Sequence, residues 1–227
     1  MKKIIFLYLF GWSCFAQPEI KRLDGTSLTA KQVDRIVEKL MEFGEVEGLA
    51  LSVINGNKAY LKTYGYRNEK ELLDPISVMY GASFSEAVFA YLTMKLVEEK
   101  KIELDKPLHE YLNKPISDFP DWAALANDET WRLITARMCL SHTTGLPNSR
   151  WIDVRTGQED TLGPLKIYFK PGTRYAYSGE GLKLLQLVEE QITGKNIEEL
   201  ADEKVFTPFG MKRTGYIWQP EFDSNYA

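Results

Sequence analysis

The stretch Gly81-Ala82-Ser83-Phe84-Ser85-Glu86 opens a helical pattern that runs from Phe84 to about Lys100. Its apolar stripe consists of Ala87, Val88, Tyr91, Leu92 and Leu96, which recur at helical spacing. The charged run Glu98-Glu99-Lys100-Lys101 ends the pattern and is typical of a solvated turn. The sequence therefore predicts a helix with Ser83 at its N-terminus.

Ser83 has two interpretations. The free backbone N–H groups and partial positive charge of a helix N-terminus favour an alkoxide or oxyanion, which suits a nucleophilic serine. Alternatively, Ser83 and Glu86 form a capping box, in which each side chain satisfies a backbone N–H group of the helix end. These residues alone favour the cap.

Upstream of this stretch, the pattern predicts a helix over residues 29–44, behind a capping box formed by Thr29 and Gln32 and ended by Gly44. Two strand-like runs follow, Leu49–Ile54 and Lys58–Tyr66. They flank Asn55-Gly56-Asn57, which is typical of a β-hairpin turn. An antiparallel sheet is expected there.

Downstream, the segment from Asp105 to Arg174 is interrupted by prolines, which favours short helices and loops. One clear helical piece is predicted in it, from Trp131 to Leu140. A further helix is predicted from Gly181 to Ile192, with Gly194 as its C-terminal cap.

A series of motifs accompanies the Ser83 stretch. In chain order these are Asp105-Lys106-Pro107-Leu108, Leu140-Ser141-His142-Thr143-Thr144-Gly145-Leu146-Pro147, Pro171-Gly172-Thr173, Tyr175-Ala176-Tyr177-Ser178-Gly179 and Pro208-Phe209-Gly210-Met211. The series resembles the serine β-lactamase-like family, which includes class C β-lactamases, penicillin-binding DD-peptidases and related esterases. The resemblance extends over most of the chain. It implies an α+β fold in which an antiparallel sheet is flanked by helices and carries a mostly helical insert.

The resemblance also implies a reaction. The family nucleophile heads an S-x-x-K motif, which places it on Ser83, and the Y-S-x motif places the family tyrosine on Tyr177. Ser83 would attack an amide or ester carbonyl to form an acyl-enzyme, which water then hydrolyses. The implied substrates are small molecules or peptides: peptidoglycan peptides, β-lactams or esters. Trp151 and Gly179 are the expected pocket residues.

Two positions depart from the family pattern. Glu86 occupies the position of the family lysine, and Gly179 that of the family asparagine. Residue 86 still shares a helix face with Ser83, but a carboxylate there opposes a tyrosinate and a developing oxyanion. The site is therefore predicted to be impaired, unless Glu86 serves as a general base for Ser83.

A third departure is length. Family members usually continue beyond the Pro208–Met211 segment with strands, one of which carries K-T-G or H-x-G, whereas this sequence stops at Ala227. The C-terminal strands of the fold are therefore expected to be missing, with residues 17–227 forming a truncated hydrolase domain. Two alternatives to an active enzyme stay open: a non-catalytic binding or structural relative, and a fragment of a longer hydrolase.

His142 invites a different reading, a Ser-His-Asp triad completed by Asp153 or Asp105. The resemblance instead implies a structural role for His142 in the turn before Gly145. The two histidines, His109 and His142, lack a metal-ligand spacing such as H-x-x-x-H. No metal or other cofactor is predicted.

The composition limits the possible partners. The 227 residues are 44% hydrophobic and 26% charged, with a formal net charge of −4, which is ordinary for a globular protein. This charge provides no basic field for a phosphate backbone, so nucleic acid is not an expected partner.

The N-terminus has the pattern of a secretory signal. Met1-Lys2-Lys3 is followed by the apolar run Ile4–Trp12 and by small residues before Gln17. Residues 1–16 are predicted to be cleaved after Ala16, which implies an exported, periplasmic or secreted protein. The apolar run is too short for a permanent membrane span, and a lipid anchor on Cys14 is the alternative.

Overall fold

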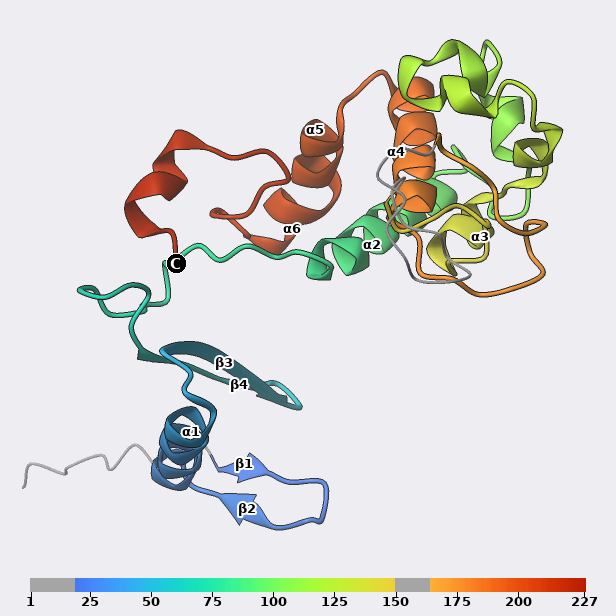
Figure 1. Cartoon of the computed structure of the whole chain (residues 1–227). Coiled ribbons are helices and arrows are strands. Elements are labelled where there is room, and N and C mark those ends of the chain that lie inside the picture. The colour runs from blue at the N-terminus through green and yellow to red at the C-terminus, as the bar shows by residue number, and fades with distance from the viewer. Residues whose placement is uncertain (1–18, 150–163) are drawn as a thin grey trace, which may run out of the picture. The chain divides into compact units, whose positions relative to one another are not determined.

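The structure is a computed structural model that describes residues 19–149 and 164–227 (Figure 1). The predicted signal segment 1–16, Trp151 and Asp153 lie outside the described residues. The chain divides into two compact units. The first contains the residues up to Met79 together with Asp223–Ala227, and the second is Tyr80–Phe222.

The first unit combines one long helix with two small antiparallel sheets. Its elements are β1 (Ile20–Lys21), β2 (Ser27–Leu28), α1 (Ala30–Gly44), β3 (Gly48–Asn55) and β4 (Lys58–Gly65). The predicted capping box is confirmed, because Thr29 and Gln32 each accept from the other's backbone N–H. The predicted end of the helix at Gly44 is confirmed, and the left-handed residue that caps it is Glu45, at φ +51°.

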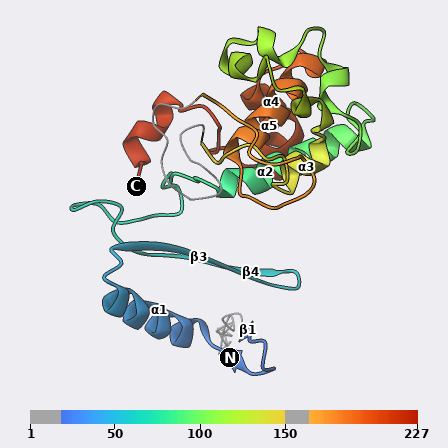
Figure 2. The ribbon, with the colours of Figure 1, turned by 45° about the vertical axis from the view of Figure 1, so that its right-hand side comes forward.

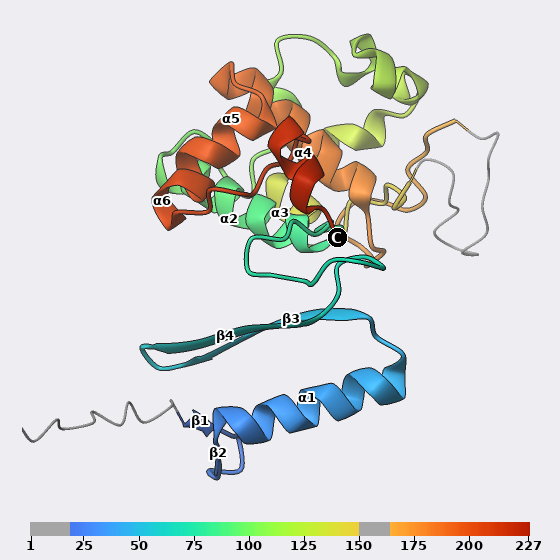
Figure 3. The same cartoon turned by 90° about the vertical axis from the view of Figure 1, so that its left-hand side faces the viewer.

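The predicted hairpin is confirmed as β3 and β4. Asn55 pairs with Lys58 across a turn in which Gly56 has a φ of +58°, a conformation that glycine adopts without strain. Helix α1 runs along one face of this hairpin (Figure 3). Asp34 of α1 fixes the contact by accepting from the hydroxyls of Tyr60 at 2.6 Å and Tyr64 at 2.8 Å.

The second unit is helical in the residues that the structure describes (Figure 2). Its α-helices are α2 (Phe84–Glu98), α3 (Ala136–Leu140), α4 (Gly179–Thr193), α5 (Ile197–Ala201) and α6 (Thr207–Phe209), with one π-helical turn at Asp202–Phe206. Short 3-10 helices of this unit lie at Leu108–Tyr111, Ile116–Asp118, Pro120–Leu125 and Glu129–Leu133, and a further one, Pro220–Asn225, extends past its last residue, Phe222. The prediction of short helices and loops in the middle segment is confirmed for its described part.

The core of this unit is built around α2 and α4. The fully buried side chains in it include Leu92, Leu96, Ile134, Leu146, Leu184 and Leu185. The predicted stripe of α2 was partly wrong, because Ala87 and Tyr91 are exposed whereas Phe89 and Thr93 are buried. The buried face of α2 is therefore formed by Phe89, Leu92, Thr93 and Leu96.

The predicted helix Trp131–Leu140 is instead two pieces. The 3-10 helix Glu129–Leu133 ends before Ile134, and α3 starts afresh behind Thr135, whose side chain accepts from the Met138 N–H. The Ile134 carbonyl accepts from the Leu108 N–H, so the chain is extended between the pieces. The helix predicted at Gly181–Ile192 is confirmed as α4, and Gly194 caps it at φ +69°.

The expected α+β class is confirmed by helices combined with antiparallel strands. Among residues 19–149 and 164–227, the sheets contain only β1–β4, so strands of the kind expected after Met211 are not among the described elements. No helix in the same residues is long and apolar enough to cross a membrane.

Candidate active site

Ser83 lies directly before α2 with an exposed side chain. The backbone turns into the helix through three successive bonds, in which the N–H groups of residues 84, 85 and 86 donate to the carbonyls of residues 81, 82 and 83. Ala82 adopts a φ of +42°, which is strained for a residue with a Cβ atom. These N–H groups are thus occupied, which corrects the expectation that they are free for an oxyanion.

The capping box predicted for Ser83 and Glu86 does not form. Ser83 has helical backbone angles, φ −68° and ψ −10°, and its side chain makes no capping bond. A capping serine needs an extended backbone to reach forward to the N–H groups of the first turn. Both side chains are therefore available for other partners.

Ser83 and Glu86 share one partner, Tyr177. Its hydroxyl lies 2.9 Å from Ser83 Oγ and also donates to Glu86 Oε1. The bond to Glu86 raises the pKa of the Tyr177 phenol, and the contact with Ser83 lowers it by less. The fold thus brings Tyr177 next to Ser83 and Glu86, each of which is more than ninety positions away in the sequence.

Tyr177 is held in place by the start of α4. The buried Ser178 caps this helix, accepting from the Gly181 N–H at 2.9 Å and donating to the Pro147 carbonyl at 3.1 Å. The Ala176 N–H donates to the His142 carbonyl at 2.9 Å. Both sides of Tyr177 are therefore bonded to the loop at residues 142–147.

His142 completes the group. Its Nδ1 accepts from the Ser178 N–H at 3.2 Å, and its Nε2 lies 3.6 Å from Glu86 Oε2. The imidazole packs on the Tyr177 ring with 4.5 Å between ring centroids. His142 thus contacts Glu86 rather than an aspartate. The triad with Asp105 is wrong, because both oxygens of Asp105 bind Arg137, at 2.6 and 2.8 Å.

Gly179 lies beside Asn148, which the sequence reading missed. The Gly179 N–H donates to Asn148 Oδ1 at 3.2 Å, and a Cβ atom on Gly179 would lie 2.7 Å from the Asn148 backbone oxygen. The departure from the family asparagine at this position therefore has a steric reason. No sequence pattern near Asn148 signals this contact across 31 residues.

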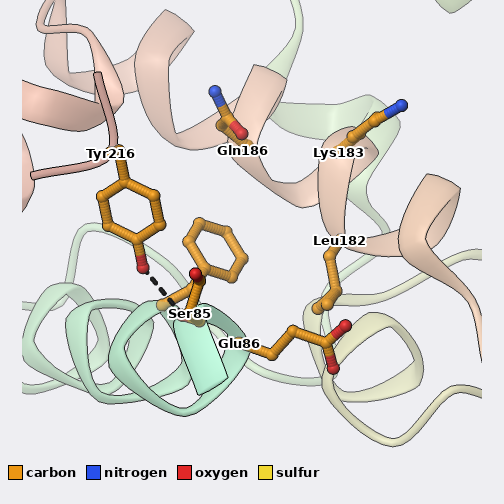
Figure 4. Close-up of a pocket in the computed structure, with 7 residues that line it drawn as sticks. Ser85, Glu86, Leu182, Lys183, Gln186 and Tyr216 are labelled. Carbon is orange, nitrogen blue, oxygen red and sulfur yellow. Dashed lines mark hydrogen bonds between the residues drawn. The ribbon is translucent and has the colours of Figure 1, made fainter. Parts of the chain in front are cut away.

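A pocket of about 120 Å³ opens next to Glu86, between α2, α4 and the segment of Tyr216 (Figure 4). It is lined by Ser85, Glu86, Phe89, Leu182, Lys183, Gln186 and Tyr216. The Tyr216 hydroxyl donates to the Ser85 carbonyl at 2.8 Å and so ties this segment to the first turn of α2. Its wall is mostly apolar, with Glu86 at the side nearest Ser83 and Tyr177.

The other polar candidates lie away from this group. Cys139 is a buried free thiol whose pKa is raised by burial, which makes it a poor nucleophile. Within the described residues, no group of three or more histidine, cysteine or acidic side chains could hold a metal ion.

This arrangement can be compared with known proteins. The sequence profile of the β-lactamase family matches residues 33–227, which is most of the chain and includes every residue of the group around Ser83. The chain belongs to the β-lactamase family. The resemblance drawn from the motifs is thereby confirmed.

Individual members of the β-lactamase family show how far the match extends. The D-alanyl-D-alanine-carboxypeptidase/endopeptidase AmpH of Escherichia coli K12 is 27% identical over 204 residues, which are 83% of this chain and 50% of AmpH. A β-lactamase/D-alanine carboxypeptidase from Yersinia pestis, solved with citrate, superposes with a TM-score of 0.68 at 24% identity. The match covers 86% of this chain and 57% of that one.

An octameric penicillin-binding protein homologue from Pyrococcus abyssi superposes with a TM-score of 0.66 at 24% identity, over 88% of this chain and 47% of that one. These structural matches establish the β-lactamase fold. The chain spans about half the length of the relatives that it matches.

Proposed function

We propose that this β-lactamase family member is a serine hydrolase that forms an acyl-enzyme on Ser83. The observation that carries the proposal is the 2.9 Å contact between Ser83 Oγ and the Tyr177 hydroxyl. A nucleophilic serine needs a proton acceptor within hydrogen-bond reach, and the phenol oxygen of Tyr177 lies within that reach. The exposed position of Ser83 leaves its oxygen open to a substrate carbonyl.

Glu86 makes this site slower than one with a lysine. Its carboxyl group raises the pKa of Tyr177, so the tyrosinate, the stronger proton acceptor, is disfavoured. A lysine ammonium would have the opposite effect on the phenol. The expected substrates are amides or esters: peptidoglycan peptides, β-lactams or small esters. Trp151 is expected to contribute to the substrate groove.

Covalent labelling tests the proposal. The full chain is incubated with a fluorophosphonate probe, and the mass of the intact protein is followed with time. We expect a single adduct that Ser83→Ala abolishes, whereas Ser85→Ala, a serine on the same helix turn, retains it. An adduct that survives in Ser83→Ala would place the reactive group elsewhere. A chain that forms no adduct at all would contradict the acyl-enzyme.

A second candidate function is non-catalytic binding. The Tyr177–Glu86 bond favours it, because it stabilises a neutral phenol next to Ser83. Such a protein would bind a penicillin or a peptidoglycan peptide reversibly. Calorimetric titration with benzylpenicillin, combined with the absence of a covalent adduct, would distinguish this function from hydrolysis.

We further propose that the protein is exported, with cleavage after Ala16. The support is the charged, apolar and small-residue order of residues 1–16. Mass analysis of protein from an exporting host should give an N-terminus at Gln17. A lipid-modified Cys14 would instead support the anchor.

A further inference from the structure

The Tyr177 hydroxyl has one proton and two oxygen neighbours. Ser83 Oγ lies 2.9 Å away, and Glu86 Oε1 is its other partner. A carboxylate is a stronger acceptor than a neutral hydroxyl, so the phenol proton points to Glu86. In the structure the phenol is also placed as the donor to Ser83 Oγ. With the phenol proton on Glu86, the Ser83 hydroxyl can turn its own proton to the phenol oxygen. The oxygens of Ser83, Tyr177 and Glu86 can then pass protons in one direction, from Ser83 to Glu86.

His142 lies against the far side of Glu86. Because its Nδ1 accepts from the Ser178 N–H, the neutral ring carries its proton on Nε2, which faces Glu86 Oε2 at 3.6 Å. The backbone of His142 is left-handed, at φ +53°, which aims the ring into the site. The side chains of His142 and Glu86 are only 15% and 27% exposed, so solvent screens this contact weakly.

The charges around Glu86 come from three elements. Tyr177 and His142 face it from the loops, and Lys183 of α4 lines the same pocket (Figure 4). The Lys183 ammonium is 3.0 Å from Glu180 Oε1, and the Lys183 side chain is 64% exposed. Its charge is therefore largely balanced by Glu180 and by solvent. Tyr216 turns its hydroxyl to the Ser85 carbonyl. Of these described groups, Tyr177 and His142 alone present a proton to the Glu86 carboxyl group.

We propose, on the basis of the Ser83 acyl-enzyme, that Glu86 receives the serine proton through Tyr177 and that His142 positions Glu86 for this transfer. Glu86 is then the final proton acceptor of a relay, and not a residue that only occupies the position of the family lysine. His142 is a positioning residue, because it acts on the carboxyl group and not on the substrate.

The relay balances in both half-reactions. As the Ser83 Oγ–carbon bond forms, the carbonyl π pair moves to the carbonyl oxygen, the serine proton moves to Tyr177 and the phenol proton moves to Glu86. Collapse of the tetrahedral adduct breaks the bond to the leaving alcohol or amine, which takes the proton back along the same path. Water then attacks the acyl carbon, loses its proton to the relay, and Ser83 recovers it as the acid leaves.

Rates of fluorophosphonate labelling and of p-nitrophenyl acetate hydrolysis test the relay. We expect Glu86→Gln and Tyr177→Phe each to slow both reactions by about 100-fold or more, the usual contribution of a general base. The double variant should be no slower than either single variant within about threefold, because both residues serve one path. Glu98→Gln, at the far end of α2, is the matched control and should react like the unmodified chain.

His142→Asn tests the positioning role. Asparagine tolerates the left-handed backbone but is too short to reach Glu86. We expect a loss of up to about fivefold, the size of one weak contact between partly exposed polar groups. The loss should fall on the kcat of p-nitrophenyl acetate hydrolysis and leave KM unchanged, because His142 acts on the carboxyl group and not on the substrate. A purely structural histidine, whose loss disturbs the loop around the site, would change KM as well.

The outcomes separate the relay from the proposed function. If Ser83→Ala reacts like the unmodified chain, the acyl-enzyme itself is wrong. If Ser83→Ala is inert while Glu86→Gln reacts at the original rate or faster, the acyl-enzyme stands and the relay is overturned. Should Glu86→Gln fail to fold, Tyr177→Phe decides: a labelling rate equal to that of the unmodified chain overturns the relay.

Discussion

The hydroxyl of Thr93 in α2 and the carboxyl group of Glu189 in α4 are joined by a hydrogen bond of 2.6 Å, and neither side chain has any exposed surface. Burial raises the pKa of Glu189 to about 8. The Thr93 hydroxyl is also 3.1 Å from the Phe89 carbonyl, to which it can donate while a protonated Glu189 donates to it. The two helices that flank the candidate site are therefore linked by a neutral carboxylic acid.

Glu189→Gln should remove a pH dependence from the stability. The folded-state pKa is raised above the ordinary value of 4.5, so the unfolded chain ionises first and the free energy of unfolding falls between about pH 4.5 and 8. The loss should approach about 1.4 kcal/mol per pH unit in this window. Urea unfolding at several pH values should give a flatter curve for Glu189→Gln, with Glu190→Gln as the matched control. If the curves of the unmodified chain and of Glu189→Gln are parallel, Glu189 is not a buried neutral acid.

Asp34 makes the stability of the first unit depend on pH in the opposite sense. Bonds from Lys62, at 2.7 Å, and from Tyr60 and Tyr64 lower its pKa to about 2. Its stabilising effect is thus complete above pH 3.8 and is lost as the pH falls through about 2. Asp34→Asn should lower the free energy of unfolding by about 1–2 kcal/mol at neutral pH, and the difference should vanish in strong acid. Glu38→Gln on the exposed face of α1 is the control, and equal stability of Asp34→Asn at neutral pH would contradict the prediction.

Much of the fold was predictable because its signals are local. The capping box of Thr29 and Gln32, the Asn55–Asn57 turn and the Gly194 cap each depend on residues within four positions of one another. The same logic failed at Ser83 and Glu86. A local rule predicted a cap there, but contacts with Tyr177 from far along the chain determine both side chains.

The candidate site was therefore only partly predictable. Ser83, Tyr177 and Glu86 followed from motif order, and the structure brings them together. His142 was considered as a triad base or a structural residue, whereas its contact with Glu86 depends on a left-handed backbone that the sequence does not specify. Asn148 carries no motif, and its contact with Gly179 depends on the approach of two loops. Such contacts arise from tertiary packing, which local patterns do not encode.

Gly179→Asn, which restores the family residue, should not restore activity. The new Cβ atom would lie 2.7 Å from the Asn148 backbone oxygen, closer than a packed carbon can approach. We expect a loss of stability of about 1–3 kcal/mol and slower labelling of Ser83, because the loop that holds Tyr177 has to shift. Gly194→Asn at the other end of α4 has open space and should cost little. Faster labelling by Gly179→Asn would show that the loop accommodates the side chain.

Glu86→Lys tests which charge the site prefers. The carboxyl group now raises the pKa of Tyr177, whereas an ammonium at the same position would lower it and favour the tyrosinate that accepts the Ser83 proton. We therefore expect Glu86→Lys to label with fluorophosphonate about tenfold faster, and its tyrosine absorbance to titrate at lower pH than in the unmodified chain. Because no capping box exists here, the stability cost should be limited to the lost contacts of Glu86 with Tyr177 and His142, about 1 kcal/mol. Slower labelling in a Glu86→Lys protein that melts normally would mean that the site works only with a carboxylate base.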